Sequence, residues 1–452
     1  MPLAERAVPD TFFDDLRQRE FARLDASNLA YLDFTGSALY AESQIAAHVR
    51  DLERGVFGNP HSAHAPSHTS THVLDAARAD VLRLLDADPA AYGVIFTANA
   101  SAALKLVGEA YPFGAAAGFV LTTDNHNSVR GIGEYARRAG AAVHELPLDD
   151  ELRLLDTDAH LRALEPRGLF AFPAQSNFSG VIHPLGLVGR AQALGFDVLL
   201  DAAAYLPTHA LSLRETPADF IVVSFYKLFG FPTGVGALVA RLDALARLVR
   251  PWFAGGTVTH VSVFLDRYHL RPGHEAFEDG TPNFLGIAAL APGFALLEAV
   301  GMPRLTAHVR RLTARLLDGL ASLTQGGGAP LVRIYGPVSM VDRGGTVAFN
   351  VLDRAGNPVP FEEVERRGRD AGVAMRGGCF CNPGASERAF GGDPDRARVC
   401  LDELHDRFTP ERLRACLGPG AAVGAMRASV GLPTNDRDVD RAIEVVAGFR
   451  EG

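Results

Sequence analysis

Between about residues 91 and 240, short apolar segments alternate with longer amphipathic ones. The apolar segments have strand length and are rich in Val, Ile, Leu and Phe, whereas the segments between them have helical spacing. This alternation predicts βαβ units and a mostly parallel sheet, and so an α/β fold. The predicted strands are 94–97, 119–122, 169–173, 198–201, 220–223 and 235–240.

The pattern changes on both sides of this region. Helical spacing recurs over 10–24, 43–54 and 283–323, and further short strands are predicted over 29–34, 332–335 and 346–352. We therefore predict two domains. The large α/β domain would hold residues 26–300, and a smaller α+β domain would hold residues 1–25 and 301–452. The apolar stretch 284–300 contains Pro292 and Glu298, so we expect buried helices there rather than a membrane span.

Five of the predicted strands are followed by a conspicuous polar side chain. In an open parallel sheet the carboxyl ends of the strands share one edge, and ligands bind at that edge. We therefore expect these side chains to surround a single site. They are Ser101, His126, Asn177, Asp201 and Lys227.

This set of side chains suits pyridoxal 5′-phosphate. Lys227 ends a buried strand with little other charge nearby, and desolvation of its amine favours Schiff-base chemistry. Asp201 would keep a pyridine nitrogen protonated, and the imidazole of His126 would stack on the ring. The phosphate would lie at the helix N-terminus near Ser101, where free N–H groups and the helix dipole favour an anion.

Taken singly, each of these residues also has a structural interpretation. Lys227 could be a strand-end side chain that reaches water, and Ser101 could be a plain helix N-cap. Asp124 and Asn125 could form a structural cap beside His126. Only the convergence of all five groups favours an active site.

A second candidate site lies in the Gly/Pro-rich segment 376–385. A thiolate at Cys381 could attack the sulfur of a cysteine-derived adduct. The Cys379-x-Cys381 spacing also permits a metal ion or a disulfide-like clip, although no second cysteine pair matches it. Arg376 and Arg427 could bind a substrate carboxylate in a bidentate manner, or form surface ion pairs.

Composition narrows the class of protein. The 452 residues carry a formal net charge of −9 and no basic cluster, which argues against nucleic-acid binding. The N-terminus has no apolar core segment, so we predict no signal peptide. Four cysteines in so long a chain do not make a disulfide framework, and we expect a cytoplasmic protein. The histidine-rich segment 58–72 lacks interleaved carboxylates or cysteines, so we expect a loop on the substrate side rather than a metal site.

Several of these motifs together resemble the class V, fold-type I pyridoxal-phosphate enzymes, the cysteine desulfurase superfamily. Within that superfamily they are most similar to the desulfurase domain of the molybdenum cofactor sulfurases. The resemblance spans most of the chain in the expected order. The segments that carry it are 95–107, 172–184, 201–203, 224–238, 277–281 and 376–385.

The resemblance implies a role for each site residue. Lys227 would form the Schiff base, and Asp201 and His126 would contact the pyridine ring. Cys381 would carry the persulfide. The other cofactor contacts would be Ser101, Ala102, Asn177, Ser224 and Tyr226, with Thr281 reaching the phosphate of a partner subunit. The substrate contacts would be Arg427, Arg376 and Asn177.

Three positions depart from the common desulfurase pattern. Tyr226 stands before the lysine where ordinary desulfurases have histidine, as in the molybdenum cofactor sulfurases. Ala204 replaces a glutamine that contacts the cofactor hydroxyl, and Asn99 stands where glycine is common. Because the chain ends at Gly452, we expect no C-terminal domain of the kind that binds molybdenum cofactor in the eukaryotic sulfurases.

The implied function is that of a homodimeric pyridoxal-phosphate enzyme that takes sulfur from L-cysteine. It would release alanine and leave a persulfide on Cys381 for transfer to an acceptor protein or cofactor, one related to molybdenum cofactor. Rival activities of the same site are those of a selenocysteine lyase, a C–S lyase or an epimerase, none of which needs Cys381. A non-catalytic binding protein with a decayed site is the rival from another class.

Overall fold

The structure is a computed structural model that describes residues 11–418 and 420–451. Residues 1–10, with which the predicted small domain begins, lie outside the described residues. The prediction of no signal peptide concerns the same N-terminal stretch. The domain boundaries at residues 25/26 and 300/301 stay a prediction.

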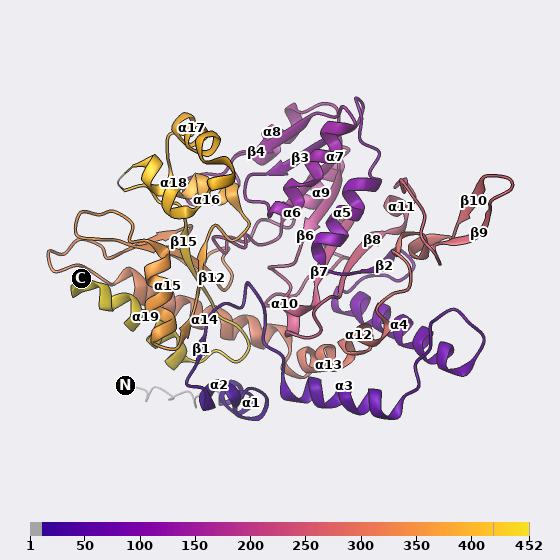
Figure 1. The fold of residues 1–452 in the computed structure, drawn as a ribbon, viewed down its shortest axis with the longest axis horizontal. Helices are drawn as coiled ribbons and strands as arrows, with labels where there is room; N and C mark the ends of the chain where they lie inside the picture. The colour runs from indigo at the N-terminus through magenta and orange to yellow at the C-terminus, as the bar shows by residue number, and fades with distance from the viewer. Residues whose placement is uncertain (1–10, 419, 452) are drawn as a thin grey trace, which may run out of the picture.

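The largest sheet has seven strands in the order β2-β8-β7-β6-β5-β3-β4 (Figure 1). Neighbouring strands from β7 to β4 are parallel, whereas β8 is antiparallel to both β2 and β7. The prediction of a mostly parallel sheet in an α/β fold is confirmed. The strands are β2 Tyr92–Thr97, β3 Gly118–Thr122, β4 Val143–Leu146, β5 Gly168–Pro173, β6 Asp197–Asp201, β7 Phe220–Ser224 and β8 Gly236–Arg241.

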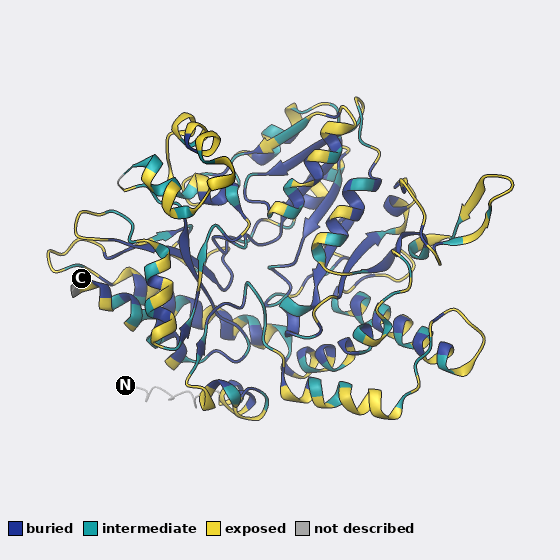
Figure 2. Ribbon diagram, viewed as in Figure 1, coloured by how far each residue is buried: buried dark blue, intermediate teal, exposed yellow. Residues whose placement is uncertain are grey.

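Both faces of this sheet are buried, and the sequence fits this because the central strands are almost continuous apolar runs. Successive side chains of a strand point to opposite faces, and in β7 they enter two separate hydrophobic clusters. Ile221 and Val223 belong to one cluster, and Phe220 and Val222 belong to the other. Figure 2 shows the central strands as buried and the outer turns of the covering helices as exposed.

Helices cover the two faces and the rim of the sheet. They are α4 Ala65–Leu84, α5 Ala100–Ala110, α6 Asn127–Arg130, α7 Ile132–Arg138, α8 Thr157–Ala163, α9 Leu187–Ala193, α10 Phe225–Phe229, α11 Leu242–Leu245, η1 Gly273–Phe277, α12 Phe284–Ala288 and α13 Leu290–Val300. The interpretation of residues 58–72 as a loop was wrong beyond Ala65, because α4 starts there with its N-terminus capped by His64. No group of three or more His, Cys, Asp or Glu side chains in residues 11–418 and 420–451 could hold a metal ion.

The stretch 284–300 forms two helices, and Leu290 and Leu297 of α13 belong to the main hydrophobic cluster. Within the described part of the chain, no single helix is long and apolar enough to cross a membrane. One pair, 284–300 with 302–321, meets that length and composition only when taken together, and it is bent by 74°.

A second, four-stranded sheet is antiparallel throughout, in the order β11-β12-β15-β14. Its strands are β11 Val332–Tyr335, β12 Thr346–Val351, β14 Arg376–Gly378 and β15 Ala425–Ser429. The helices of this part are α14 Met302–Ala321, α15 Phe361–Asp370, α16 Pro383–Phe390, α17 Pro394–Leu404, η2 His405–Arg407, α18 Pro410–Leu417, α19 Asp436–Ala447 and η3 Gly448–Glu451.

The N-terminal segment joins the second sheet region rather than the first. β1 Ala30–Tyr31 pairs in parallel with β13 Val373–Ala374, so the strand predicted over 29–34 is shorter than expected. The helix predicted over 10–24 is divided into α1 Phe12–Glu20 and α2 Arg23–Ala26, with buried Phe21 at the break. α3 Glu42–Arg54 follows as predicted. This path brings Asp33, just after β1, close to Ser429 of β15.

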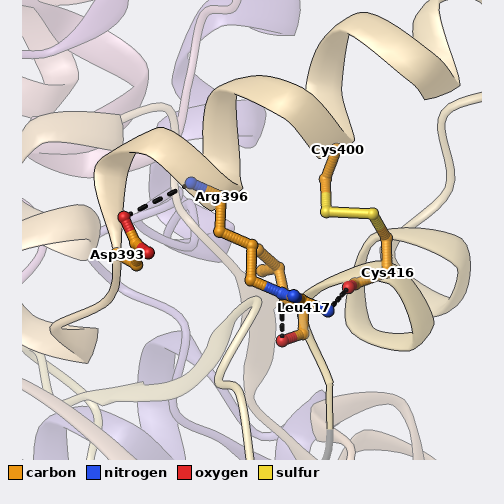
Figure 3. The surroundings of a disulfide bond; sticks show 5 residues. All are labelled: Asp393, Arg396, Cys400, Cys416 and Leu417. Carbon is orange, nitrogen blue, oxygen red and sulfur yellow. Dashed lines mark hydrogen bonds between the residues drawn. A yellow bond between two sulfur atoms is a disulfide. The ribbon is translucent and has the colours of Figure 1, made fainter.

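Two features were not predicted. The first is a projecting hairpin formed by β9 Val258–Ser262 and β10 Arg267–Leu270 (Figure 1). It lies within residues 251–280, where the sequence shows no regular hydrophobic pattern. The second is a disulfide between Cys400 of α17 and Cys416 of α18 (Figure 3). The guanidinium of Arg396 also donates hydrogen bonds to the carbonyls of Cys416 and Leu417, so α17 and α18 are joined twice. The expectation that the cysteines form no disulfide framework is therefore corrected for this one pair.

Candidate active site

A cavity of about 230 Å³ opens at the carboxyl ends of the parallel strands. β5, β6 and β7 contribute their last residues, Pro173, Asp201 and Ser224, to its lining, and the segments that follow β2 and β3 contribute Ser101 and His126, as the strand-end argument predicts. Seven of the predicted site residues therefore line one cavity. They are Ser101, His126, Asn177, Asp201, Ser224, Tyr226 and Lys227.

One end of the cavity has the character of an anion site. It lies at the start of α5, whose first-turn N–H groups have no partners within the helix. The helix cap is Asn99 rather than Ser101, since the Asn99 side chain accepts a hydrogen bond from the Ala102 N–H at 2.9 Å. The Ser101 hydroxyl lies 2.6 Å from that of Ser128, and the buried hydroxyl of Ser224 makes no hydrogen bond in the structure.

The lining of the cavity also includes a carboxylate and an imidazole. Asp201 is buried at the end of β6, and its Oδ1 accepts a hydrogen bond from the Ala203 N–H. His126 accepts a hydrogen bond from the Ser128 N–H at Nδ1 and so caps α6 itself, which corrects the expectation of a cap built from Asp124 and Asn125. Burial lowers the pKa of His126, which favours the neutral ring. Because Nδ1 accepts a hydrogen bond, the neutral ring carries its proton on Nε2.

Lys227 lies in the single turn of α10, which directly follows β7. Phe225, Leu228 and Phe229 bury the outer side of this turn, and Lys227 therefore faces the cavity. Gly230 ends the helix with a φ of 79°, and a Cβ there would lie 2.3 Å from the backbone nitrogen of Tyr40. A glycine is thus required to bring the chain past this point.

The electrostatic surroundings of Lys227 suit a nucleophilic amine. Desolvation lowers the pKa of Lys227, and the positive charge of Arg427 adds to this effect. The negative charge of Asp201 opposes the shift, and a thiolate at Cys381 would do so too. The loop that holds Cys381, residues 379–382 and hereafter the Cys381 loop, lies against the cavity, because the Cys381 carbonyl accepts a hydrogen bond from the N–H of Asn127, next to His126, at 2.8 Å. Lys227 and Cys381 are 154 positions apart in the sequence.

The two candidate carboxylate-binding arginines share one counterion, Asp33. Arg376 binds Asp33 through Nε and Nη2, with the shortest contact at 2.6 Å, and Arg427 binds it through Nη2 at 3.0 Å. Arg427 is buried, whereas the Arg376 side chain is half exposed. The hydrogen bond to Asp33 raises the pKa of Arg376, while burial lowers the pKa of Arg427. Only Arg376 resembles the surface ion pair that was the alternative interpretation.

Comparison with protein-family models decides the family. The model described as aminotransferase class-V matches residues 30–441 of this chain. The chain belongs to the class-V aminotransferase family.

Curated relatives of the chain include the molybdenum cofactor sulfurases of Solanum lycopersicum and Bos taurus. Each is 34% identical to it over 96% of the chain. The matched regions make up 56% of the tomato protein and 52% of the bovine one. The chain thus spans about half the length of these relatives.

Solved structures share the whole fold. The apo structure of a cysteine desulfurase from Thermococcus onnurineus superposes with a TM-score of 0.79 at 24% identity, with full coverage of both chains. The cysteine desulfurase CsdA from Escherichia coli has a TM-score of 0.74 at 24% identity, and the match covers 97% of this chain and 98% of that one. These likenesses confirm the predicted fold type.

Some of the predicted site residues in the described part of the chain do not line this cavity. Thr281 is exposed and lines a separate cavity of about 250 Å³ together with Ala102. The Ala102 N–H is already bonded to Asn99. Arg376, Arg427 and Cys381 belong to the second sheet region and to the loop after it, rather than to the cavity lining.

Sequence reasoning missed three residues of this region. Asp33 follows a short apolar strand, but its partners Arg376 and Arg427 lie hundreds of positions away. Gln175 is buried in the cavity wall beside Ala204, and its Oε1 makes no hydrogen bond. It therefore places an amide near the position where the usual glutamine is replaced by alanine. Asn382 is fully buried next to Cys381 and carries no chemical signature of its own.

Proposed function

We propose that this protein is a pyridoxal-phosphate-dependent enzyme of the cysteine desulfurase type, which moves sulfur from L-cysteine to Cys381. The observation that carries the proposal is the arrangement of Lys227, Asp201 and His126 around one cavity, with the Cys381 loop hydrogen-bonded to Asn127 and Asn177 beside it. The curated relatives named molybdenum cofactor sulfurase support the sulfur chemistry.

The residues present fit pyridoxal phosphate. The unpaired, buried Ser224 hydroxyl and the start of α5 would hold the phosphate. Asp201 would hold the pyridine nitrogen, and the neutral His126 ring would stack on the cofactor ring. Lys227, whose pKa burial lowers, would hold the cofactor covalently. When bound, the cofactor would supply an electron sink for a substrate carbanion.

The protein's own groups would then perform the sulfur transfer. Arg427 would orient the substrate carboxylate, and the Lys227 amine would move the proton at the substrate α-carbon. The Cys381 thiolate would attack the substrate sulfur, so that an S–S bond forms while the C–S bond of the substrate breaks. L-Cysteine and the Cys381 thiol would yield L-alanine and a Cys381 persulfide, with no external oxidant.

This proposal is tested with purified, cofactor-loaded protein and L-cysteine. Alanine is measured by chromatography, and mass spectrometry detects one added sulfur on Cys381. We expect Cys381→Ala to lose the persulfide and most of the alanine production. Cys379→Ser, the matched control in the same loop, should keep both. Unchanged alanine production by Cys381→Ala would contradict the persulfide route and favour a lyase of the selenocysteine type. A C–S lyase or an epimerase would produce no alanine from cysteine even in the wild type.

The same preparation tests the non-enzymatic alternative, a binding protein with a decayed site. A functional Lys227 predicts a visible absorption band on loading with pyridoxal phosphate, and this band should be lost in Lys227→Ala. A wild-type protein without the band would favour the decayed site.

We also propose a homodimer. Figure 2 shows the projecting β9–β10 hairpin as mostly exposed. Its tip exposes three consecutive apolar side chains, Val263, Phe264 and Leu265, with exposed fractions of 88%, 101% and 70%. A projecting apolar tip of this kind is typical of a protein interface. A second copy that covers the hairpin would bury this tip, and Thr281 would face the partner's phosphate site.

Light scattering coupled to gel filtration tests the dimer. Phe264→Asp should convert the wild-type dimer into a monomer. Phe408→Asp makes the same change at another exposed phenylalanine, outside the hairpin, and should leave the dimer intact. A wild-type monomer, or a dimer that survives Phe264→Asp, would contradict the proposal.

The sulfur acceptor would be a protein or a cofactor, and the names of the relatives favour one related to molybdenum cofactor. A cytoplasmic location is likewise our proposal, based on cysteine usage. Disulfides are rare in a reducing cytoplasm, so the Cys400–Cys416 disulfide of the structure should be open in cells, and thiol labelling there should find both cysteines reduced. Oxidised cysteines there would argue for another compartment.

A further inference from the structure

The side chain next to Cys381 is bonded more fully than any role in capping requires. Asn382 is completely buried, and its Nδ2 donates hydrogen bonds to the Asp124 carbonyl at 2.7 Å and to Asn177 Oδ1 at 2.9 Å. Its Oδ1 accepts a hydrogen bond from the Ala385 N–H and so caps α16. One short side chain therefore joins the Cys381 loop to two strand ends of the large sheet, those of β3 and β5.

The loop conformation needs such an anchor. Phe380 and Cys381 have φ values of 57° and 54°, two successive non-glycine residues in the left-handed region. Residues in this region persist when their surroundings hold them in place. The Cys381 carbonyl accepts a hydrogen bond from the Asn127 N–H, and the Phe380 carbonyl accepts one from Asn177 Nδ2. Cys381 itself is exposed, so its own side chain contributes little to this order.

Asn177 connects the loop to the substrate side of the cavity. Both ends of its side-chain amide are used by loop residues, Phe380 and Asn382. Its backbone carbonyl accepts a hydrogen bond from Arg427, whose guanidinium lies 4.6 Å from the centre of the Phe380 ring. The loop, Asn177 and the proposed carboxylate-binding arginine therefore form one contiguous network.

We propose that Asn382 is a positioning residue that holds the Cys381 loop closed against the cofactor cavity. This inference rests on the proposed function. In the closed loop the Cys381 sulfur is held where it can form the S–S bond as the substrate C–S bond breaks. Release of the two hydrogen bonds donated by Asn382 frees the strained loop to carry the persulfide to an acceptor.

The test separates positioning from capping. Serine is a good N-cap but cannot reach the Asp124 carbonyl and Asn177 Oδ1, so Asn382→Ser keeps the cap and loses both donated bonds. Asn435→Ser makes the same change at the N-cap of α19, far from the loop in sequence. Two lost hydrogen bonds shift the equilibrium towards the open loop by about tenfold or more.

We expect two changes in Asn382→Ser that Asn435→Ser does not show. Amide hydrogen exchange, measured on the peptides around Asn127 and over residues 379–386, should be about tenfold faster. Single-turnover formation of the Cys381 persulfide should be about tenfold slower, while the cofactor absorption band and the spectral change on binding cysteine stay as in the wild type.

Wild-type exchange and persulfide rates in Asn382→Ser would overturn the inference, and so would an equal loss in Asn435→Ser. The hydrogen-exchange measurement needs no turnover. The positioning role can therefore fail while desulfuration holds, and desulfuration can fail while the loop behaves as expected.

Discussion

The cavity wall and the Cys381 loop are two halves of one proposed site, and they are held in place in different ways. The wall is formed by the ends of five parallel strands whose side chains fill two hydrophobic clusters, so its geometry is set by the core of the protein. The loop is held by side-chain hydrogen bonds that Asn382 donates to Asp124 and Asn177 and that Asn177 donates to Phe380, and it has two residues in strained backbone conformations. The difference suggests that the wall holds its side chains rigidly, whereas the loop can move and carry the sulfur of Cys381.

The largest expected effect separates the two halves. Lys227→Ala should lower alanine production by about 10²–10⁴-fold or more, because both the covalent anchor and the proton-moving base are lost. It should also abolish the cofactor band. Cys381→Ala should lose the product while the band persists, since the wall is intact. Loss of the band in Cys381→Ala would show that the two halves are not independent.

The second effect concerns Asp33, the carboxylate that Arg376 and Arg427 share. Arg427→Met removes a buried cation bonded to Asp33 and should lower the free energy of unfolding by about 3–5 kcal/mol. Arg376→Met removes a half-exposed partner of the same carboxylate and should cost about 1 kcal/mol or less. Urea unfolding of both variants measures the difference. Equal losses would mean that burial does not distinguish the two arginines.

The same contrast explains what could be predicted from the sequence. Strand-end residues such as Asp201 and Lys227 are predictable because apolar runs locate strands, and parallel strands bring their ends together. Asp33 and Asn382 were missed because their partners lie hundreds of positions away, and no local pattern encodes a contact of this length. The capping roles of Asn99 and His126 were assigned to neighbours, since several adjacent polar residues can cap equally well on sequence alone.

The third prediction extends the comparison to the helices that follow the loop. The Cys400–Cys416 disulfide closes a segment with a sequence separation of 16, for which loop closure stabilises the folded segment by about 3 kcal/mol. With both cysteines changed to serine, proteolysis within residues 393–418 should be about 100-fold faster, because it follows the population of the locally opened form. Alanine production should not change. A parallel loss of activity would show that this pair of helices supports the wall or the loop.

The last prediction tests whether burial of the Lys227 amine in the cavity wall lowers the free energy of unfolding. In the unfolded chain Lys227 titrates near its ordinary pKa of 10.5, and in the folded apoprotein its pKa is lowered by desolvation. Between these two values the unfolded chain binds one more proton than the folded protein, so stability rises with pH. The wild-type apoprotein should therefore gain stability relative to Lys227→Met as pH rises towards 10.5, by up to about 1.4 kcal/mol per pH unit. Urea unfolding of both apoproteins at several pH values measures this slope. A difference that does not vary with pH would mean that water reaches the amine in the folded apoprotein, and that its reactivity comes from its neighbours rather than from burial.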